Sequence, residues 1–204
     1  MFTENEVTAL INYPGIQEKT AALKERFIAE EAEFLEISDH DFLSLVLLTP
    51  SVGLALANGS VSLFEEMALN KKARKLSKGG YWMKKDPVVF ALENLIDGYD
   101  KWSSIFYGHI RMLMEETIHV DALKNTTFDL SKVTEENQCL EVLRSPFIII
   151  RFLTSFFMND EEEDMLGVRK ISKLEYDKIE EIAEQLGLND IPIFQIYRSR
   201  LIVK

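Results

Sequence analysis

The sequence is poor in the residues that interrupt helices and in the residue that cross-links chains. Its 204 residues include five prolines, nine glycines and a single cysteine, Cys139. One cysteine cannot form an internal disulfide, which favours a reducing compartment, and its apolar neighbours indicate a packing role. Few prolines and glycines favour helices over a β-architecture with many turns. The composition therefore predicts an all-α protein with an ordinary hydrophobic core.

The chain also lacks the signals of export and of membrane insertion. Its first residues, MFTENEVTAL, carry acids where a signal peptide carries lysines. The most apolar stretch, SPFIIIRFLTSFFM at 145–158, is too short to span a bilayer and contains Arg151. We expect a cytoplasmic protein without membrane insertion, in which 145–158 is a buried helix and Arg151 is paired or reaches solvent.

Negative charge dominates, but one window carries the opposite sign. The formal net charge is −11, whereas residues 71–85 hold seven Lys or Arg and no acid, so the rest of the chain carries −18. An acidic protein of this kind is a poor general binder of nucleic acid. A local anionic partner remains compatible with the basic window.

Apolar residues recur at helical spacing along almost the whole chain. The longest such pattern, 88–120, keeps one apolar face for about nine turns and predicts a long central helix. Residues 191–203 suit a helix or a strand. The sequence thus predicts one all-α domain over 1–204, a bundle of seven to nine helices. The other predicted helices lie at 3–12, 16–36, 41–58 with a break or kink at Thr49-Pro50, 62–78, 135–144, 146–158 and 174–186.

Residues 54–66, LALANGSVSLFEE, admit two local structures. Asn58-Gly59 between alternating apolar residues is typical of a two-residue β-hairpin. The stretch also fits a helix that ends at Asn58-Gly59, followed by a helix whose Ser62 and Glu65 form an S-x-x-E capping box. An isolated hairpin would have no further strand to pair with and is marginally stable in water. The helical alternative is therefore predicted.

The arrangement around Asn58-Gly59 occurs a second time. An apolar helix at 146–158 leads through Asn159-Asp160 and an insertion to ISKLE at 171–175, which matches VSLFE at 61–65 as apolar–Ser–x–apolar–Glu. In both copies the Ser and the Glu are placed to cap the following helix. The pattern indicates a duplicated helix-turn-helix unit.

On these residues the chain resembles the tellurite-resistance TerB-like family. ALANGSVSLFEE is similar to the family's Ala-Asp-Gly-x-Val-Ser-x-x-Glu stretch, and ISKLEYDKIEEIAEQLGL to its second capped helix, over about 47–77 and 147–200. The resemblance implies a compact helical bundle without established catalysis, a role in stress response or assembly, and acidic turns that bind divalent metal. This chain departs from the pattern in both turns, with Asn58 in place of the expected aspartate and Asn159-Asp160-Glu161 in place of Asp-Gly.

An acidic run after the helix at 146–158 is the first candidate site. Five adjacent carboxylates at 160–164 offer the oxygen ligands that Ca²⁺ or Mg²⁺ prefers. The spacing does not match an EF-hand loop, and a solvated acidic loop would show the same pattern. A divalent metal is the one cofactor that the sequence leaves open. The candidate ligands are Asp160, Glu162, Asp164 and Glu175.

The basic window, NKKARKLSKGGYWMKK, is the second candidate site. Cations attract phosphate and exposed aromatic rings stack on bases, as on RNA or single-strand surfaces. Lysines at a helix C-terminus also interact favourably with the helix dipole without any partner. Of the two kinds of partner, an acidic protein, including a second copy of this chain, is favoured over nucleic acid. The candidate partner-binding or anion-binding residues are Lys71, Lys72, Arg74, Lys75, Lys78 and Trp82.

The stretch 179–201 has the spacing of a DNA-binding helix-turn-helix, with Ala183 and Gly187 four residues apart. Its recognition helix would expose Phe194 and Gln195 among residues that are poor at base recognition. A plain pair of helices is the simpler interpretation.

No catalytic signature stands out in the sequence. We therefore expect a non-enzymatic, TerB-like cytoplasmic protein that serves as an interaction or scaffold module, through a protein partner or self-association. One alternative is a nucleic-acid-binding regulator that uses the basic window or the stretch 179–201. Another is a metal-dependent enzyme built on the acidic run with Glu116 and His119.

Overall fold

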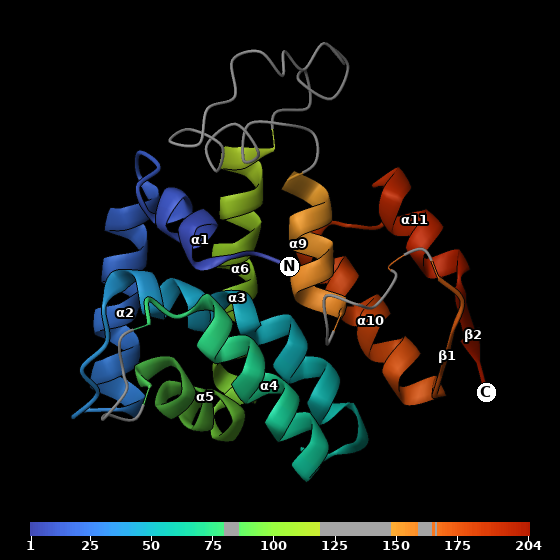
Figure 1. The fold of residues 1–204 in the computed structure, drawn as a ribbon, viewed down its shortest axis with the longest axis horizontal. Helices are drawn as coiled ribbons and strands as arrows, with labels where there is room; N and C mark the ends of the chain where they lie inside the picture. Colours follow the sequence, from blue (N-terminus) through green and yellow to red (C-terminus); the bar gives the residue numbers. More distant parts are fainter. Residues whose placement is uncertain (80–85, 119–147, 159–164, 166) are drawn as a thin grey trace.

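The computed structural model describes residues 1–79, 86–118, 148–158, 165 and 167–204. The predicted all-α class is confirmed, because helices dominate these ranges (Figure 1). The predicted helix at 135–144 and Cys139 lie outside the described residues. The elements are α1 (Glu4–Ile11), α2 (Ile16–Glu31), α3 (Asp39–Ala55), η1 (Leu56–Asn58), α4 (Leu63–Leu76), α5 (Pro87–Asp97), α6 (Tyr99–Thr117), α9 (Ile148–Phe157), β1 (Arg169–Ile171), α10 (Lys173–Leu186), α11 (Pro192–Ser199) and β2 (Leu201–Val203).

Helix α3 occupies the centre of the bundle. Every residue from His40 to Gly53 is buried, and α3 packs against α1, α2, α4, α5, α6, α9 and α10. Figure 1 shows α1, α2 and α5 on one side of α3 and α9, α10 and α11 on the other. A helix that is apolar nearly all round is typical of such an enclosed position. The stretch Asp39–Asn58 also has the length and hydropathy of a membrane span, but 83% of its apolar window is buried inside the protein, as in a core helix.

The predicted break or kink at Thr49-Pro50 does not end α3. Proline lacks an N–H group, so the carbonyl four residues earlier, that of Val46, loses its usual helical donor. The hydroxyl of Thr49 donates to this carbonyl instead, at 2.8 Å. The buried helix can therefore continue through Pro50 to Ala55.

In place of the predicted long central helix at 88–120, the structure has two helices that meet at Gly98. There the backbone has ψ of 15°, and a Cβ would lie 3.1 Å from the Asn94 carbonyl oxygen and 3.2 Å from Trp102 Cδ1. Glycine also has a low helix propensity. Apolar spacing did not reveal the break because Leu95 in α5 and Phe106 in α6 both still face the core.

Aromatic rings from α2, α3 and α6 form the core on one side of the bundle. Phe27, Phe42, Trp102 and Phe106 pack in tilted or edge-to-face pairs with centroids 5.0–5.8 Å apart. All four side chains are fully buried. Such pairs stabilise a core beyond the area that they bury.

The predicted helical structure around Asn58-Gly59 is confirmed. Gly59 adopts the left-handed conformation, with φ of 87°, and Ser62 caps α4. The Ser62 N–H donates to the Glu65 carboxylate at 2.7 Å, and the Glu65 N–H donates to Ser62 Oγ at 3.4 Å. The same reciprocal pair opens α10, where Ser172 and Glu175 form bonds of 2.7 and 3.2 Å. Both units thus begin their second helix in the same way.

Ser62→Ala and Ser172→Ala should each lower the free energy of unfolding by about 1 kcal/mol, because each leaves helix-terminal N–H groups without an acceptor. Urea unfolding of each variant measures the loss. Ser60→Ala is the matched control, since Ser60 is exposed and does not cap a helix. A capping variant as stable as the control would contradict the assignment.

The ambiguous segment 191–203 contains both a helix and a strand. In α11, the rings of Phe194 and Tyr197 pack against Phe157 of α9. Their centroids lie 5.8 and 5.4 Å, respectively, from the centroid of Phe157. β2 then pairs in parallel with β1, a two-stranded sheet that the sequence did not predict. Of the two residues that a recognition helix here would expose, Phe194 is buried and Gln195 is exposed, so the helix-turn-helix alternative stays a prediction.

Arg151 is paired, as its apolar neighbourhood required. Its Nε lies 3.1 Å from Glu6 Oε1, and the Glu6 side chain is only 4% exposed. The other carboxylate oxygen of Glu6 accepts the Thr3 N–H at 2.9 Å in the capping box of α1. One buried carboxylate therefore ties α1 to α9.

Candidate interaction site

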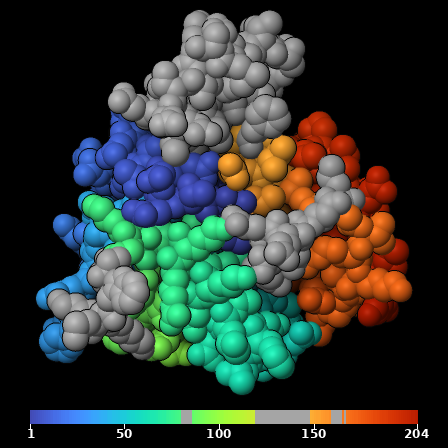
Figure 2. All heavy atoms as spheres, viewed as in Figure 1, coloured from blue at the N-terminus to red at the C-terminus, as the bar shows by residue number. Residues whose placement is uncertain are grey.

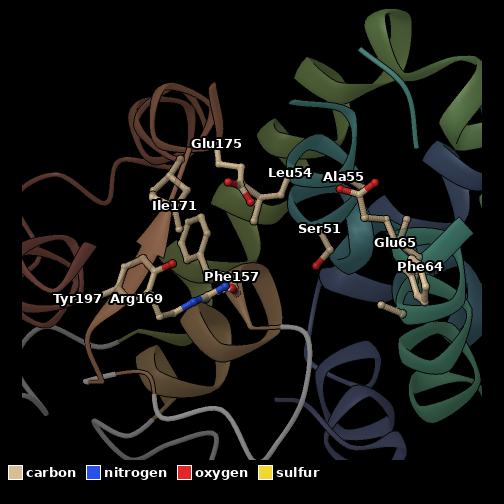
Figure 3. A pocket seen from close by; sticks show the side chains of 13 residues that line it. Ser51, Leu54, Ala55, Phe64, Glu65, Phe157, Arg169, Ile171, Glu175 and Tyr197 are labelled. Atoms are coloured by element: carbon tan, nitrogen blue, oxygen red, sulfur yellow. Dashed lines mark hydrogen bonds between the residues drawn. The ribbon is translucent and has the colours of Figure 1, made fainter. Parts of the chain in front are cut away.

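A cavity of about 190 Å³ lies between the two helix-turn-helix units. Figure 3 shows one wall formed by α3 and α4 and the other by α9, β1, α10 and α11. The apolar part of its lining includes Leu54, Ala68 and Leu69 on the first wall and Phe157, Ile171 and Ile179 on the second. The volume is close to that of cavities of about 150 Å³ that hold benzene, and below the range of about 300–1,000 Å³ of typical ligand pockets. It suits one apolar side chain.

Large apolar side chains are exposed on both helices that flank this cavity. On α4, Leu63, Phe64 and Met67 are 69%, 82% and 61% exposed, and we call these three residues the α4 patch. Phe64 itself lines the cavity. On α10, Leu174 is 56% exposed, beside the cavity-lining Glu175. Figure 2 shows the surfaces of α4 and α10 next to each other on one face of the molecule. Exposed apolar residues gathered around a cavity are typical of a protein-binding surface.

The polar groups of the cavity hold its walls in place. Arg169 Nη1 donates to the Phe157 carbonyl at 3.1 Å, at the C-terminal end of α9. Glu65 and Glu175 line the cavity while their Oε2 atoms serve the two capping boxes. Because last-turn carbonyls have no intrahelical donor, Arg169 supplies one at a helix end that favours positive charge.

Lys72, predicted as part of a basic surface, is buried at the joint between α4 and α9. Only 3% of it is exposed, and its Nζ donates to Ser51 Oγ at 2.6 Å and to the Ser155 carbonyl at 3.1 Å. Ser51 also donates to the carbonyls of Ser155 and Phe156. Helical spacing explains the burial, because position 72 falls on the same face of α4 as Leu69 and Leu76. Lys72 therefore connects α4 to α3 and α9 and is not available to an anion at the surface.

The other predicted cations lie elsewhere. Lys71, Arg74 and Lys78 are exposed and Lys75 is half-buried, whereas Trp82 lies outside the described residues. The nucleic-acid alternative keeps three exposed cations near the end of α4 and stays a prediction.

The predicted metal ligands cannot be placed together. Asp160, Glu162 and Asp164 lie outside the described residues, and so does His119. Within the described ranges no three His, Cys, Asp or Glu side chains are grouped so that they could hold a metal ion. Glu175 is described and lines the cavity. The metal site stays a prediction.

The cavity itself was not predicted, but one sequence signal pointed to its rim. Leu63, Phe64 and Met67 lie on the side of α4 opposite to Leu69 and Leu76, which face the core. Apolar residues on both sides of a helix at a protein surface indicate that something else covers the outer side.

Comparison with known proteins gave no relative. A scan against protein-family models, a search of curated proteins and a search of solved structures found no match to this chain. Membership of the TerB-like family therefore stays a prediction from residues 55–66 and 171–188.

Proposed function

We propose that this chain is a non-enzymatic, TerB-like interaction module that binds a helical segment of a partner protein between α4 and α10. One apolar side chain of that segment enters the 190 Å³ cavity, and its neighbours cover the α4 patch. The observation that carries the proposal is the exposure of Phe64, 82%, at the mouth of an apolar cavity of one-side-chain size. An amphipathic helix in an apolar groove is a common mode of peptide recognition.

The chemistry of the lining supports binding over catalysis. In the lining, the side chains of Ser51 and Arg169 donate to main-chain carbonyls of α9, and Glu65 and Glu175 accept main-chain N–H groups. These bonds make the walls rigid, and a rigid, preformed cavity reduces the entropy cost of binding an anchor side chain.

Peptides selected from a displayed library of helical sequences for binding to the full chain provide the test. Phe64→Ser and Ala68→Leu should each lower the affinity for the selected peptides about thirtyfold. The first removes a contact with the anchor side chain, and the second fills the cavity that this side chain enters. Phe34→Ser is the matched control, because Phe34 is 92% exposed and does not line the cavity. Affinity is measured by fluorescence anisotropy.

Equal affinities of Phe64→Ser and Phe34→Ser for every selected peptide would reject this site. All three positions lie outside the fully buried core, so thermal melts should match the parent closely.

A further inference from the structure

A second hollow lies beside the η1 turn, away from the cavity between α4 and α10. It consists of two adjoining depressions of about 660 and 290 Å³, which share Leu56, Ile96 and Asp97. The larger one reaches α4 and α5, and the smaller one reaches the start of α6 and Lys178 of α10. No lining residue is common to this hollow and the first cavity. Its function is therefore separable from the one proposed above.

The floor of this hollow is apolar. Leu92 is buried, and Leu56, Val61 and Ile96 are partly buried and pack against the core. The larger depression has a volume within the range of about 300–1,000 Å³ that is typical of binding sites. It has room for several apolar side chains, whereas the first cavity holds one.

The rim of the hollow is acidic. Glu66, Asp97 and Asp100 are exposed, and none of the three forms an ion pair with another described residue. Glu93 adds a fourth carboxylate to the lining. The single cation in the lining, Lys178, lies 2.5 Å from Glu181 and is thus already paired. The rim therefore carries three exposed negative charges beside the apolar floor.

We infer that this hollow binds a cationic amphipathic segment of a partner protein. The apolar face of the segment covers Leu56, Val61 and Ile96, and its Lys or Arg side chains meet the three exposed carboxylates of the rim. Charge complementarity favours this occupant. The carboxylates of the rim would repel an acidic segment, and a neutral segment would supply no opposite charge to them. A second copy of the chain fits poorly, since its net charge is also −11.

Two synthetic amphipathic helices with the same leucine face test the inference. One carries lysines on its polar face and the other glutamates, and both are labelled for fluorescence anisotropy with the full chain. The lysine peptide should bind, with an affinity that falls as salt is added, and the glutamate peptide should not.

Two variants with the same change in net charge separate the hollow from general attraction to an acidic protein. Glu66→Gln/Asp97→Asn/Asp100→Asn should lower the affinity for the lysine peptide about tenfold, which is the combined effect expected from the loss of three exposed ion pairs of ordinary strength. Glu18→Gln/Glu25→Gln/Glu33→Gln removes three exposed acids of α2 and its following turn, and it should change the affinity by less than about twofold. Val61→Ser should lower the affinity for the lysine peptide about threefold, because it removes apolar surface from the floor of the hollow.

Equal weakening in the two triple variants would overturn the inference, as would equal binding of the two peptides. Phe64→Ser distinguishes the two sites. It should leave the lysine peptide unaffected, and a loss of binding in that variant would place the peptide in the first cavity and reject the hollow. If Phe64→Ser instead binds both the selected helical peptides and the lysine peptide as tightly as the parent does, only the function proposed above is rejected.

Discussion

Gly53→Ala is expected to lower the free energy of unfolding by about 3 kcal/mol, a large cost for the addition of one methyl group. Gly53 is buried in α3, where α6 crosses it. A Cβ at this position would lie 2.2 Å from the Tyr99 hydroxyl oxygen, 3.0 Å from Tyr99 Cζ and 3.1 Å from the Tyr107 hydroxyl oxygen. The neighbouring side chains must therefore move.

The cost has two parts because the two tyrosines depend on each other. Their hydroxyl groups are buried and lie 2.7 Å apart in a hydrogen bond. Burial raises the pKa of Tyr99 to about 12 and that of Tyr107 well above its ordinary value of 10, so both hydroxyl groups stay neutral at ordinary pH. Overpacking costs about 1–3 kcal/mol, and a buried hydroxyl that loses its partner costs about 1–3 kcal/mol more.

Gly108→Ala is the matched control in the same pair of helices. Gly108 is exposed inside α6, and a Cβ there would meet no atom within 4 Å. This substitution should raise the free energy of unfolding by about 0.5 kcal/mol, because alanine has the higher helix propensity. Urea unfolding compares the variants, and the expected loss for Gly53→Ala corresponds to a shift of about 10 °C in Tm for a protein of this size.

Tyr99→Phe in the Gly53→Ala background provides a further check. It removes the atom at 2.2 Å, so the double variant should be more stable than the sum of the single effects by about 1 kcal/mol or more. If the stability changes of Gly53→Ala and Tyr99→Phe are strictly additive, or if Gly53→Ala is as stable as Gly108→Ala, then α3 and α6 do not pack as closely at Gly53 as described.

The parts of the fold that depend on local sequence were predictable. The capping boxes of Ser62 and Ser172 each need only four consecutive residues, and the left-handed glycines at 59 and 187 mark turns by their own backbone freedom. Such signals correctly located α4 and α10. They also decided between a hairpin and two helices at 54–66.

The arrangement of the helices was less predictable, because it depends on contacts between distant segments. The apolar face of 88–120 continues across Gly98, so periodicity alone could not show that α5 and α6 are separate. Helix α3 is central because it is apolar nearly all round, a feature that gives no periodic signal.

The candidate site shows the same limit more strongly. Lys72 looked like one cation among seven, but its ammonium group lies at the end of α9, a helix more than seventy residues away in sequence. The cavity combines residues 51–69 with residues 157–197. No local pattern specifies that combination, and only the exposed α4 patch hinted at it.

Acidification is expected to destabilise the protein by about 2 kcal/mol between pH 7 and pH 5 through His109. The His109 side chain is 8% exposed, and its Nε2 lies 3.0 Å from Thr20 Oγ1. Burial, and to a smaller extent the charge of Lys19, lowers the pKa of His109 from 6.5 to about 4. In the folded protein the imidazole therefore stays neutral over this range.

The direction of the effect follows from where the proton binds first. The unfolded chain takes up the proton as the pH falls below about 6.5, whereas the folded chain does so only near pH 4. The free energy of unfolding therefore decreases from about pH 6.5 down to pH 4, and His109 has no effect on it at higher pH. The full difference in pKa corresponds to about 3 kcal/mol, of which about 2 kcal/mol is lost by pH 5.

His40 acts in the opposite direction, and its effect lies above pH 6.5, where that of His109 ends. Burial lowers its pKa, but the hydrogen bonds to Asp41 and to the Glu4 carbonyl, together with the charge of Asp41, raise it more. Its contribution to stability is present at pH values below its unfolded pKa and is lost as the pH rises through its folded pKa. The profile of the parent protein is thus a sum of opposed effects. A single curve cannot separate them.

The difference between the parent and His109→Gln isolates the effect of His109. Glutamine keeps a hydrogen-bonding side chain beside Thr20 but binds no proton in this range. Urea unfolding from pH 7 to pH 5 should therefore show about 2 kcal/mol less loss in the variant than in the parent, and His40→Gln should increase the loss. Parallel curves for the parent and His109→Gln would mean that the ring gains access to water or a counter-charge when protonated, which its burial against Thr20 and beside Lys19 argues against.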